Sequence, residues 1–123
     1  MAKKNVLIIE DEKDTAAIIR DSLNNKDYEI TIASSAVEGM RRTKEILPDL
    51  ITLDIKMPLV DGIEMLEELK NNEKTKDIPV IIITGVDQNY RKKCLEYGIE
   101  DYFQKPLDFK RLQNKINSIL NKK

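Results

Sequence analysis

The sequence predicts a single α/β domain with a doubly wound, five-stranded parallel sheet in the order 2-1-3-4-5 and helices on both faces. Five short apolar segments alternate strictly with five segments of helical periodicity. Such alternation is typical of a parallel sheet joined by right-handed crossovers. The first, third and fourth apolar segments are apolar throughout, which favours central strands, whereas the second and fifth are mixed, which favours edges.

The expected strands are short and rich in β-branched residues. They cover residues 5–9, 28–33, 50–53 and 80–83, with a short fifth strand at Tyr102 and Phe103. The second strand alternates, with Tyr28, Ile30 and Ile32 on one face and polar residues on the other. This alternation predicts an edge strand.

Helix start and stop signals separate the strands. The expected helices cover about 14–24, 35–47, 62–70, 87–97 and 108–120. Ser35 with Glu38, and Asp61 with Glu64, have the spacing of capping boxes. Gly98 is expected to stop the fourth helix, and the last helix is amphipathic.

Composition excludes several classes of protein. The chain has 123 residues, 41% hydrophobic and 35% charged, with a net charge of -1, which predicts no bulk attraction to nucleic acid. No apolar run approaches the roughly 20 residues of a membrane span, and the apolar run near the N-terminus is too short for a signal peptide. The single cysteine, Cys94, is interpreted as a packing residue in a reducing cytoplasm.

Acidic residues follow two strands that are expected to be neighbours. Glu10 and Asp11 come directly after the first strand, and Asp54 comes after the third. The switch point of the predicted sheet lies between these strands, so the carboxylates should converge on one crevice. Taken singly, Asp54 could start a turn and Asp11 could cap the first helix.

The converging carboxylates predict metal-assisted chemistry. Three carboxylates repel one another, and Mg²⁺ suits a site with few carboxylates and several waters. Thr84 adds a hydroxyl at the end of the fourth strand, and Lys105 adds a cation after the fifth. Together they form an apparatus for phosphoryl transfer to Asp54. Separately, Thr84 could satisfy a strand end and Lys105 could be a solvated loop residue.

Four motifs in order carry a resemblance to a known family. They are Ile8-Ile9-Glu10-Asp11-Glu12, Leu53-Asp54-Ile55-Lys56-Met57-Pro58 with Asp61-Gly62, Ile83-Thr84-Gly85, and Tyr102-Phe103-Gln104-Lys105-Pro106. From Val6 to Leu120 the chain resembles the flavodoxin-like receiver domain of two-component response regulators, of the single-domain, chemotaxis-regulator-like kind.

The resemblance implies a phosphoacceptor that catalyses its own phosphorylation and slow dephosphorylation without being a conventional enzyme. Asp54 would accept a phosphoryl group from a histidine kinase or phosphotransfer protein. Asp11, Asp54 and the backbone carbonyl of Lys56 would bind Mg²⁺, and Glu10 would hold it through water. Glu10 stands where the family also uses aspartate.

The resemblance also assigns a switch. Thr84 would bond the phosphoryl oxygens, Lys105 would pair with them, and Tyr102 would follow Thr84 inward. The Lys105-Pro106 bond would be cis. Separately, neither Lys56 nor Val86 offers a carboxylate or amide to position the water that would hydrolyse phosphorylated Asp54, which predicts a long-lived phosphoprotein. Gly85 has the opposite effect, because it leaves the approach to the site open.

A partner surface is expected on the last two helices and the fifth strand. Residues 1–123 are interpreted as one receiver domain with no output domain, so the effect would come through binding a downstream protein. Residues 90–123 hold nine basic and four acidic side chains, and Tyr90, Tyr97 and Tyr102 are candidate anchors. A solvated helix face is the alternative. DNA binding is disfavoured because no helix-turn-helix follows.

Other classes fit less well. A haloacid-dehalogenase-type phosphatase needs a second aspartate where Lys56 stands, and a flavodoxin-like cofactor site would not place Glu10, Asp11 and Glu12 beside a phosphate. A receiver that only docks partners is disfavoured by the intact site. A phosphorelay intermediate, and an isolated receiver domain of a longer regulator, both remain alternatives.

Overall fold

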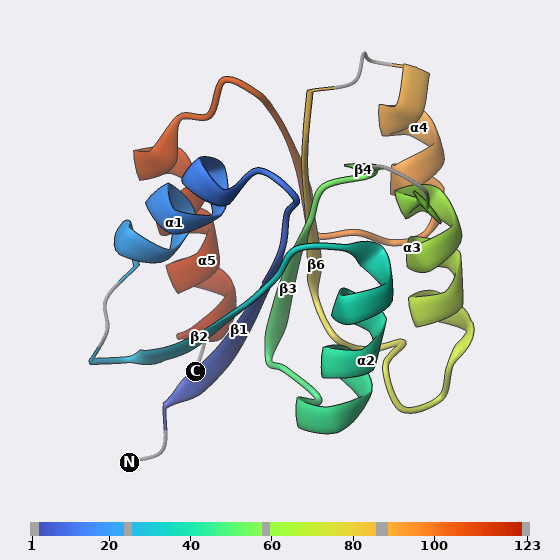
Figure 1. The fold of residues 1–123 in the computed structure, drawn as a ribbon, viewed down its shortest axis with the longest axis horizontal. Coiled ribbons are helices and arrows are strands. Elements are labelled where there is room, and N and C mark those ends of the chain that lie inside the picture. Colours follow the sequence, from blue (N-terminus) through green and yellow to red (C-terminus); the bar gives the residue numbers. More distant parts are fainter. Residues whose placement is uncertain (1–2, 24–25, 58–59, 86–88, 122–123) are drawn as a thin grey trace.

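The computed structural model describes residues 3–23, 26–57, 60–85 and 89–121, and the side chains of 56, 57, 60, 61 and 89 are outside the description. Its main sheet has five parallel strands in the order β2-β1-β3-β6-β7 (Figure 1). In chain order they are β1 (Lys4–Ile9), β2 (Tyr28–Ala33), β3 (Leu50–Leu53), β6 (Val80–Thr84) and β7 (Asp101–Gln104). The predicted strand order and the two predicted edge strands are confirmed.

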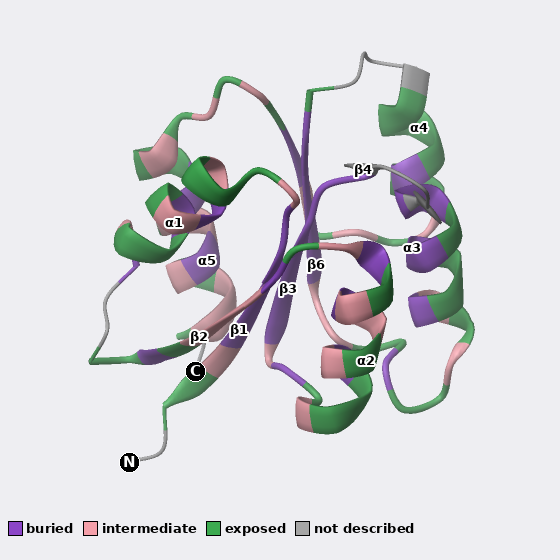
Figure 2. Ribbon diagram, viewed as in Figure 1, coloured by how far each residue is buried: buried purple, intermediate pink, exposed green. Residues whose placement is uncertain are grey.

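The three central strands form the buried middle of the molecule. Every residue of β3 and β6 is buried, as are the last four of β1 (Figure 2). Continuous apolar sequence produces this burial because helices cover both faces of a parallel sheet. The register aligns Ile9 with Leu53 across β1 and β3, so these two strands end at the same level.

The helices of the described part of the chain cover the sheet in two layers (Figure 1). On one face lie α1 (Lys13–Asp21) and α5 (Phe109–Leu120); on the other lie α2 (Ala36–Ile46), α3 (Gly62–Asn71) and α4 (Asn89–Glu96). Two apolar clusters divide in the same way, one containing Ile19 and Leu112 and the other containing Leu66 and Cys94. The prediction that Cys94 is a packing residue is confirmed by its complete burial.

Local signals set several helix ends as predicted. The Ser35 hydroxyl oxygen accepts a hydrogen bond from the Glu38 backbone N–H at 3.1 Å. The Glu38 carboxylate turns instead to Arg41, at 2.6 Å, so only the first half of the predicted capping box forms. Gly98 has a φ of 75°, a left-handed conformation that favours glycine after a helix. The expected start at Asp87 and the Asp61 side chain lie outside the described residues.

The link from β3 to α3 contains a feature that the sequence did not predict. Strands β4 (Lys56–Met57) and β5 (Val60–Asp61) pair antiparallel in a small hairpin. Helix α3 begins directly after it, and the Gly62 N–H donates to the Ile55 carbonyl at 3.0 Å. A Cβ at Gly62 would lie 2.3 Å from the Ile55 Cα, so only glycine permits this close approach.

The described helices are short or polar compared with membrane-spanning ones. Within the part of the chain that the structure describes, no helix combines the length and the apolar character needed to cross a bilayer.

Candidate functional site

Backbone hydrogen bonds bring the site residues to one edge of the sheet. The Asp54 N–H donates to the Ile9 carbonyl at 3.0 Å, which places Asp54 beside the residue that precedes Glu10. The Lys105 N–H donates to the Thr84 carbonyl at 2.9 Å. The carboxyl ends of β1, β3, β6 and β7 therefore meet where a doubly wound sheet places its ligands.

The Lys105 ammonium lies among three carboxylates. Its Nζ is 3.0 Å from Asp54 Oδ2, 2.7 Å from Glu12 Oε1 and 3.0 Å from Glu10 Oε1. The Glu10 and Asp54 side chains are 2% and 4% exposed, whereas that of Glu12 is 61% exposed. The Lys105-Pro106 peptide bond is cis. One cation thus faces three acidic groups, two of them buried.

This excess of negative charge alters the ionisation of the cluster. Burial raises the pKa of the Glu10 carboxyl to about 7, and the charge of Asp54 adds to this, although the hydrogen bond from Lys105 opposes it. Burial alone would lower the pKa of Lys105, but its hydrogen bonds to Glu12, Glu10 and Asp54 outweigh burial and raise it. The hydrogen bond from Lys105 lowers the pKa of Glu12.

The donor set fits a divalent cation. Oxygens of Glu10, Glu12 and Asp54 lie within 4.8 Å of one another. Glu10 Oε2 accepts from the Glu12 N–H at 3.2 Å and from Lys105, whereas the buried Oε1, 3.0 Å from the Lys105 ammonium, accepts no well-aligned hydrogen bond from the described residues. A buried carboxylate oxygen with an open lone pair is a ligand that hard cations prefer. The cluster can therefore bind a metal ion.

The carboxylate cluster differs in one member from the predicted one. The sequence predicts Glu10, Asp11 and Asp54 as the carboxylates of the metal site and assigns no role to Glu12. In the structure Glu12 joins the cluster through Lys105, whereas Asp11 is half-buried next to it. The only signal for Glu12 was the run of three acidic residues after β1. The Lys56 side chain and Val86, on which the predicted long phosphoryl lifetime depends, lie outside the described residues.

The expected switch residues are both buried. Thr84 is fully buried at the end of β6, and Tyr102 is 7% exposed in the apolar cluster that contains Cys94. The Tyr102 ring is thus already buried, and its further inward movement stays a prediction.

Tyr102 also presents little surface for a partner, in contrast to its expected place among the surface anchors. Tyr90 is 43% exposed, and the Tyr97 hydroxyl donates to Glu67 at 2.6 Å. Tyr90 is therefore the most available of the three candidate anchors.

Sheet order and the cluster at the switch point define a receiver-type α/β protein. A sequence model of the response regulator receiver domain matches residues 6–117. The chain belongs to this family.

Known proteins agree with this assignment. The chain is 35% identical to hybrid signal transduction histidine kinase D of Dictyostelium discoideum over 98% of its own length, and 33% identical to response regulator ArlR of Staphylococcus saprophyticus over 95%. It spans 8% of that kinase and 52% of ArlR, or about half of the response regulator.

Solved structures share the fold. The signal receiver domain of a DNA binding response regulator from Colwellia psychrerythraea has a TM-score of 0.91 at 28% identity, covering 98% of this chain and 100% of that one. The Mn(2+)-bound form of response regulator Rcp1 has a TM-score of 0.82 at 28% identity, covering 94% and 92%. The manganese is bound by Rcp1, and it agrees with a metal-binding capacity in proteins of this fold.

Proposed function

We propose that the chain is a phosphoacceptor that takes a phosphoryl group onto Asp54 in a Mg²⁺-dependent reaction and thereby changes a partner-binding surface. One observation carries the proposal. Asp54, buried at the switch point, lies 3.0 Å from the Lys105 ammonium, inside a carboxylate cluster that fits a divalent cation. A nucleophile, a fixed cation and a metal site are the parts that phosphoryl transfer requires.

The reaction is a substitution at phosphorus. An Asp54 oxygen attacks the phosphorus atom, a P–O bond to Asp54 forms, and the bond from phosphorus to the donor nitrogen breaks. The electron pair of that bond leaves with the donor imidazole, which takes up a proton. The Lys105 ammonium, on the nucleophile's side, pairs with a phosphoryl oxygen once it releases Glu12 and Glu10.

Asp11 and Asp54, with the Lys56 carbonyl, are the proposed Mg²⁺ ligands, and Glu10 holds the ion through water. Glu12 is the further carboxylate that the geometry brings to the cluster. Bound Mg²⁺ neutralises the cluster and the incoming phosphoryl oxygens. The buried Oε1 of Glu10 supports this set, because it faces the Lys105 ammonium but accepts no well-aligned hydrogen bond from the described residues, so an ion or its water could bind it.

Signalling is proposed to pass from Thr84 to the face formed by α4, β7 and α5. The hydroxyl of Thr84 bonds the phosphoryl oxygens, and the backbone of β6 moves with it. Tyr102, on the adjacent strand, adjusts within its buried position. Tyr90 and Tyr97 then meet a downstream protein, and the basic residues of 90–123 favour an acidic one.

The donor is a phosphohistidine on another segment or protein, since these 123 residues contain no histidine. A histidine kinase or a phosphotransfer protein has this chemistry, and we propose a cytoplasmic location where both occur. A relay role, in which Asp54 passes the group onward, is the second candidate. The likeness to part of a hybrid histidine kinase supports it.

Phosphorylation by a small donor tests the proposal. Incubation with acetyl phosphate and Mg²⁺ is expected to add one phosphoryl mass to the intact protein, and chelation of Mg²⁺ should prevent it. The Asp54→Asn variant should not take up the group, whereas Asp21→Asn, at an exposed position on α1, should behave like wild type. Uptake by Asp54→Asn at the wild-type rate contradicts the assignment.

A further inference from the structure

Helix α2 carries an outward-facing stripe of three apolar side chains and one lysine. Val37, Met40, Lys44 and Leu47 follow one another at spacings of three, four and three, which places them on one side of the helix and its end. Val37 is 70% exposed and Leu47 is 48% exposed. Large apolar side chains that share an exposed stripe indicate a contact surface more than isolated ones do.

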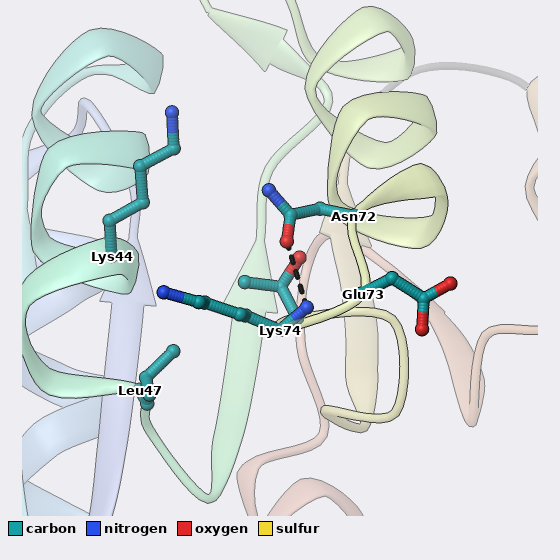
Figure 3. Close-up of a pocket in the computed structure, with 6 residues that line it drawn as sticks. Lys44, Leu47, Asn72, Glu73 and Lys74 are labelled. Atoms are coloured by element: carbon teal, nitrogen blue, oxygen red, sulfur yellow. Dashed lines mark hydrogen bonds between the residues drawn. The ribbon is translucent and has the colours of Figure 1, made fainter.

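Two hollows follow this stripe along the side of α2 that faces α3. The first, of about 350 Å³, is lined by Val37, Met40 and Met65 together with charged side chains of α2 and α3. The second, of about 400 Å³, lies between the end of α2 and the loop after α3, and Leu47 forms part of its wall (Figure 3). Lys44 lines both hollows, so they adjoin each other along α2, and the pair is called the groove below.

The groove has opposite charges at its two ends. Glu64 and Glu68 of α3 line the first hollow and Lys74 lines the second, while Lys44 lies between them and lines both. Figure 3 shows Lys74 extending from the loop toward the last turn of α2.

These four charged side chains are not used in ion pairs within the described part of the chain. None of the four forms an ion pair with another described residue. Glu73 also lines the second hollow but is paired with Lys76 at 3.1 Å, so it does not neutralise the basic end.

We propose that this groove is the contact of a weak antiparallel homodimer in which a second copy of the chain covers the α2–α3 face. A two-fold axis perpendicular to α2 reverses the direction of the groove in the partner. The acidic end of one copy then faces the basic end of the other at both ends of the contact. A surface that is split in this way is self-complementary, which is what a two-fold interface requires.

The composition of the groove sets the strength of this dimer. The apolar part is small and the groove is rimmed by charge, which is typical of transient association. Exposed charges are screened by salt over about 8 Å at physiological ionic strength. Dimerisation should therefore weaken as salt is added. No residue of the Glu10, Glu12 and Asp54 cluster lines either hollow, so the contact goes beyond the proposed function and should persist in Asp54→Asn.

Paired charge reversal tests the arrangement. One variant carries Glu64→Lys and Glu68→Lys, and the other carries Lys44→Glu and Lys74→Glu. In each variant alone, like charges meet at both ends, and the dimer should weaken about tenfold or more. In a one-to-one mixture, opposite charges meet again at both ends, so a heterodimer should form. Sedimentation velocity over a concentration series measures all three, and urea unfolding verifies that each variant is folded.

The control carries Lys92→Glu and Lys110→Glu on exposed parts of α4 and α5, and it makes the same change in net charge as Lys44→Glu with Lys74→Glu. It should dimerise like wild type. A mixture that associates no more strongly than its components overturns the proposal, as does an equal loss in the control. Wild-type protein that stays monomeric at every concentration also overturns it and leaves the groove to a different protein.

Discussion

Helices α4 and α5 lie on either side of β7 and are held to the sheet very differently. Helix α5 buries Leu112 and Ile116, its Gln113 amide donates to the Ser22 carbonyl at 2.6 Å, and its Asn117 accepts from the Tyr28 hydroxyl. Among the described side chains of α4, Cys94 is the one that is buried. Helix α5 therefore makes side-chain hydrogen bonds to the end of α1 and to β2, whereas α4 buries only Cys94 among its described side chains.

The difference teaches which helix can respond to the site. Free energy for local opening is low where few apolar groups are buried. Both helices connect to the carboxyl edge through β6 and β7, but moving α5 would break contacts to α1 and β2. The Arg111 guanidinium also stacks over the Phe103 ring, 4.6 Å from its centroid. We therefore infer that α4 takes up most of a change at Thr84 while α5 stays in place.

Core truncations should give the largest contrast. Leu112→Ala is expected to lower the free energy of unfolding by about 3 kcal/mol, since it leaves a cavity in a fully buried position. Cys94→Ala should cost about 1 kcal/mol, because fewer atoms are removed. Urea unfolding of the purified variants measures both.

Leu95→Ala serves as the control on α4. Leu95 is 48% exposed, so its truncation should change stability by less than about 0.5 kcal/mol. Equal losses in Leu112→Ala and Cys94→Ala would contradict the idea that α4 is the more weakly held helix.

Removing the cation of the carboxylate cluster should give the second-largest loss of stability. Lys105→Met leaves the buried carboxylates of Glu10 and Asp54 without their cation and should cost about 2 kcal/mol. Saturating Mg²⁺ should recover much of this loss, because the ion replaces the missing charge. Thermal unfolding with Mg²⁺ and with a chelator measures the difference. Lys13→Met, at an exposed position, should show neither effect.

Removing one tyrosine hydroxyl beside α5 and one beside α4 tests the same difference between the two helices. Tyr28→Phe deletes the bond to Asn117 and the one from Asn121, and should cost about 1 kcal/mol. Tyr97→Phe deletes the bond to the exposed Glu67 and should cost less than about 0.5 kcal/mol. Unfolding midpoints in urea compare the pair. A larger loss in Tyr97→Phe would mean that the α3–α4 contact is stronger than its exposure indicates.

Sequence reasoning reached the sheet order because each strand's burial is encoded in its own residues. The position of Asp54 followed, since the carboxyl ends of neighbouring parallel strands must meet. Glu12 could not be predicted in the same way. Its role depends on the reach of the Lys105 side chain, 93 residues away, and not on any local pattern.

Local sequence patterns could not predict the burial of Tyr102 or the arrangement of charges along the groove either. Tyr102 has the sequence context of an anchor, but its ring is buried in an apolar cluster that only the packed fold creates. The charge-split groove combines residues of α2, α3 and the following loop, which no single segment contains.

The smallest effect concerns amide exchange in the two helices. In the unphosphorylated protein, amides of α4 should exchange faster than those of α5, because α4 opens with less loss of buried area. Phosphorylation with acetyl phosphate and Mg²⁺ should change exchange in α4 by a few fold and leave α5 nearly unchanged. Thr84→Ala should still take up the group but lose the change in α4, whereas Thr84→Ser, which keeps the hydroxyl, should retain it. Mass-resolved hydrogen exchange reads both helices in one experiment. A response that is as large in α5, or that survives in Thr84→Ala, would show that the two helices are coupled to the site in some other way.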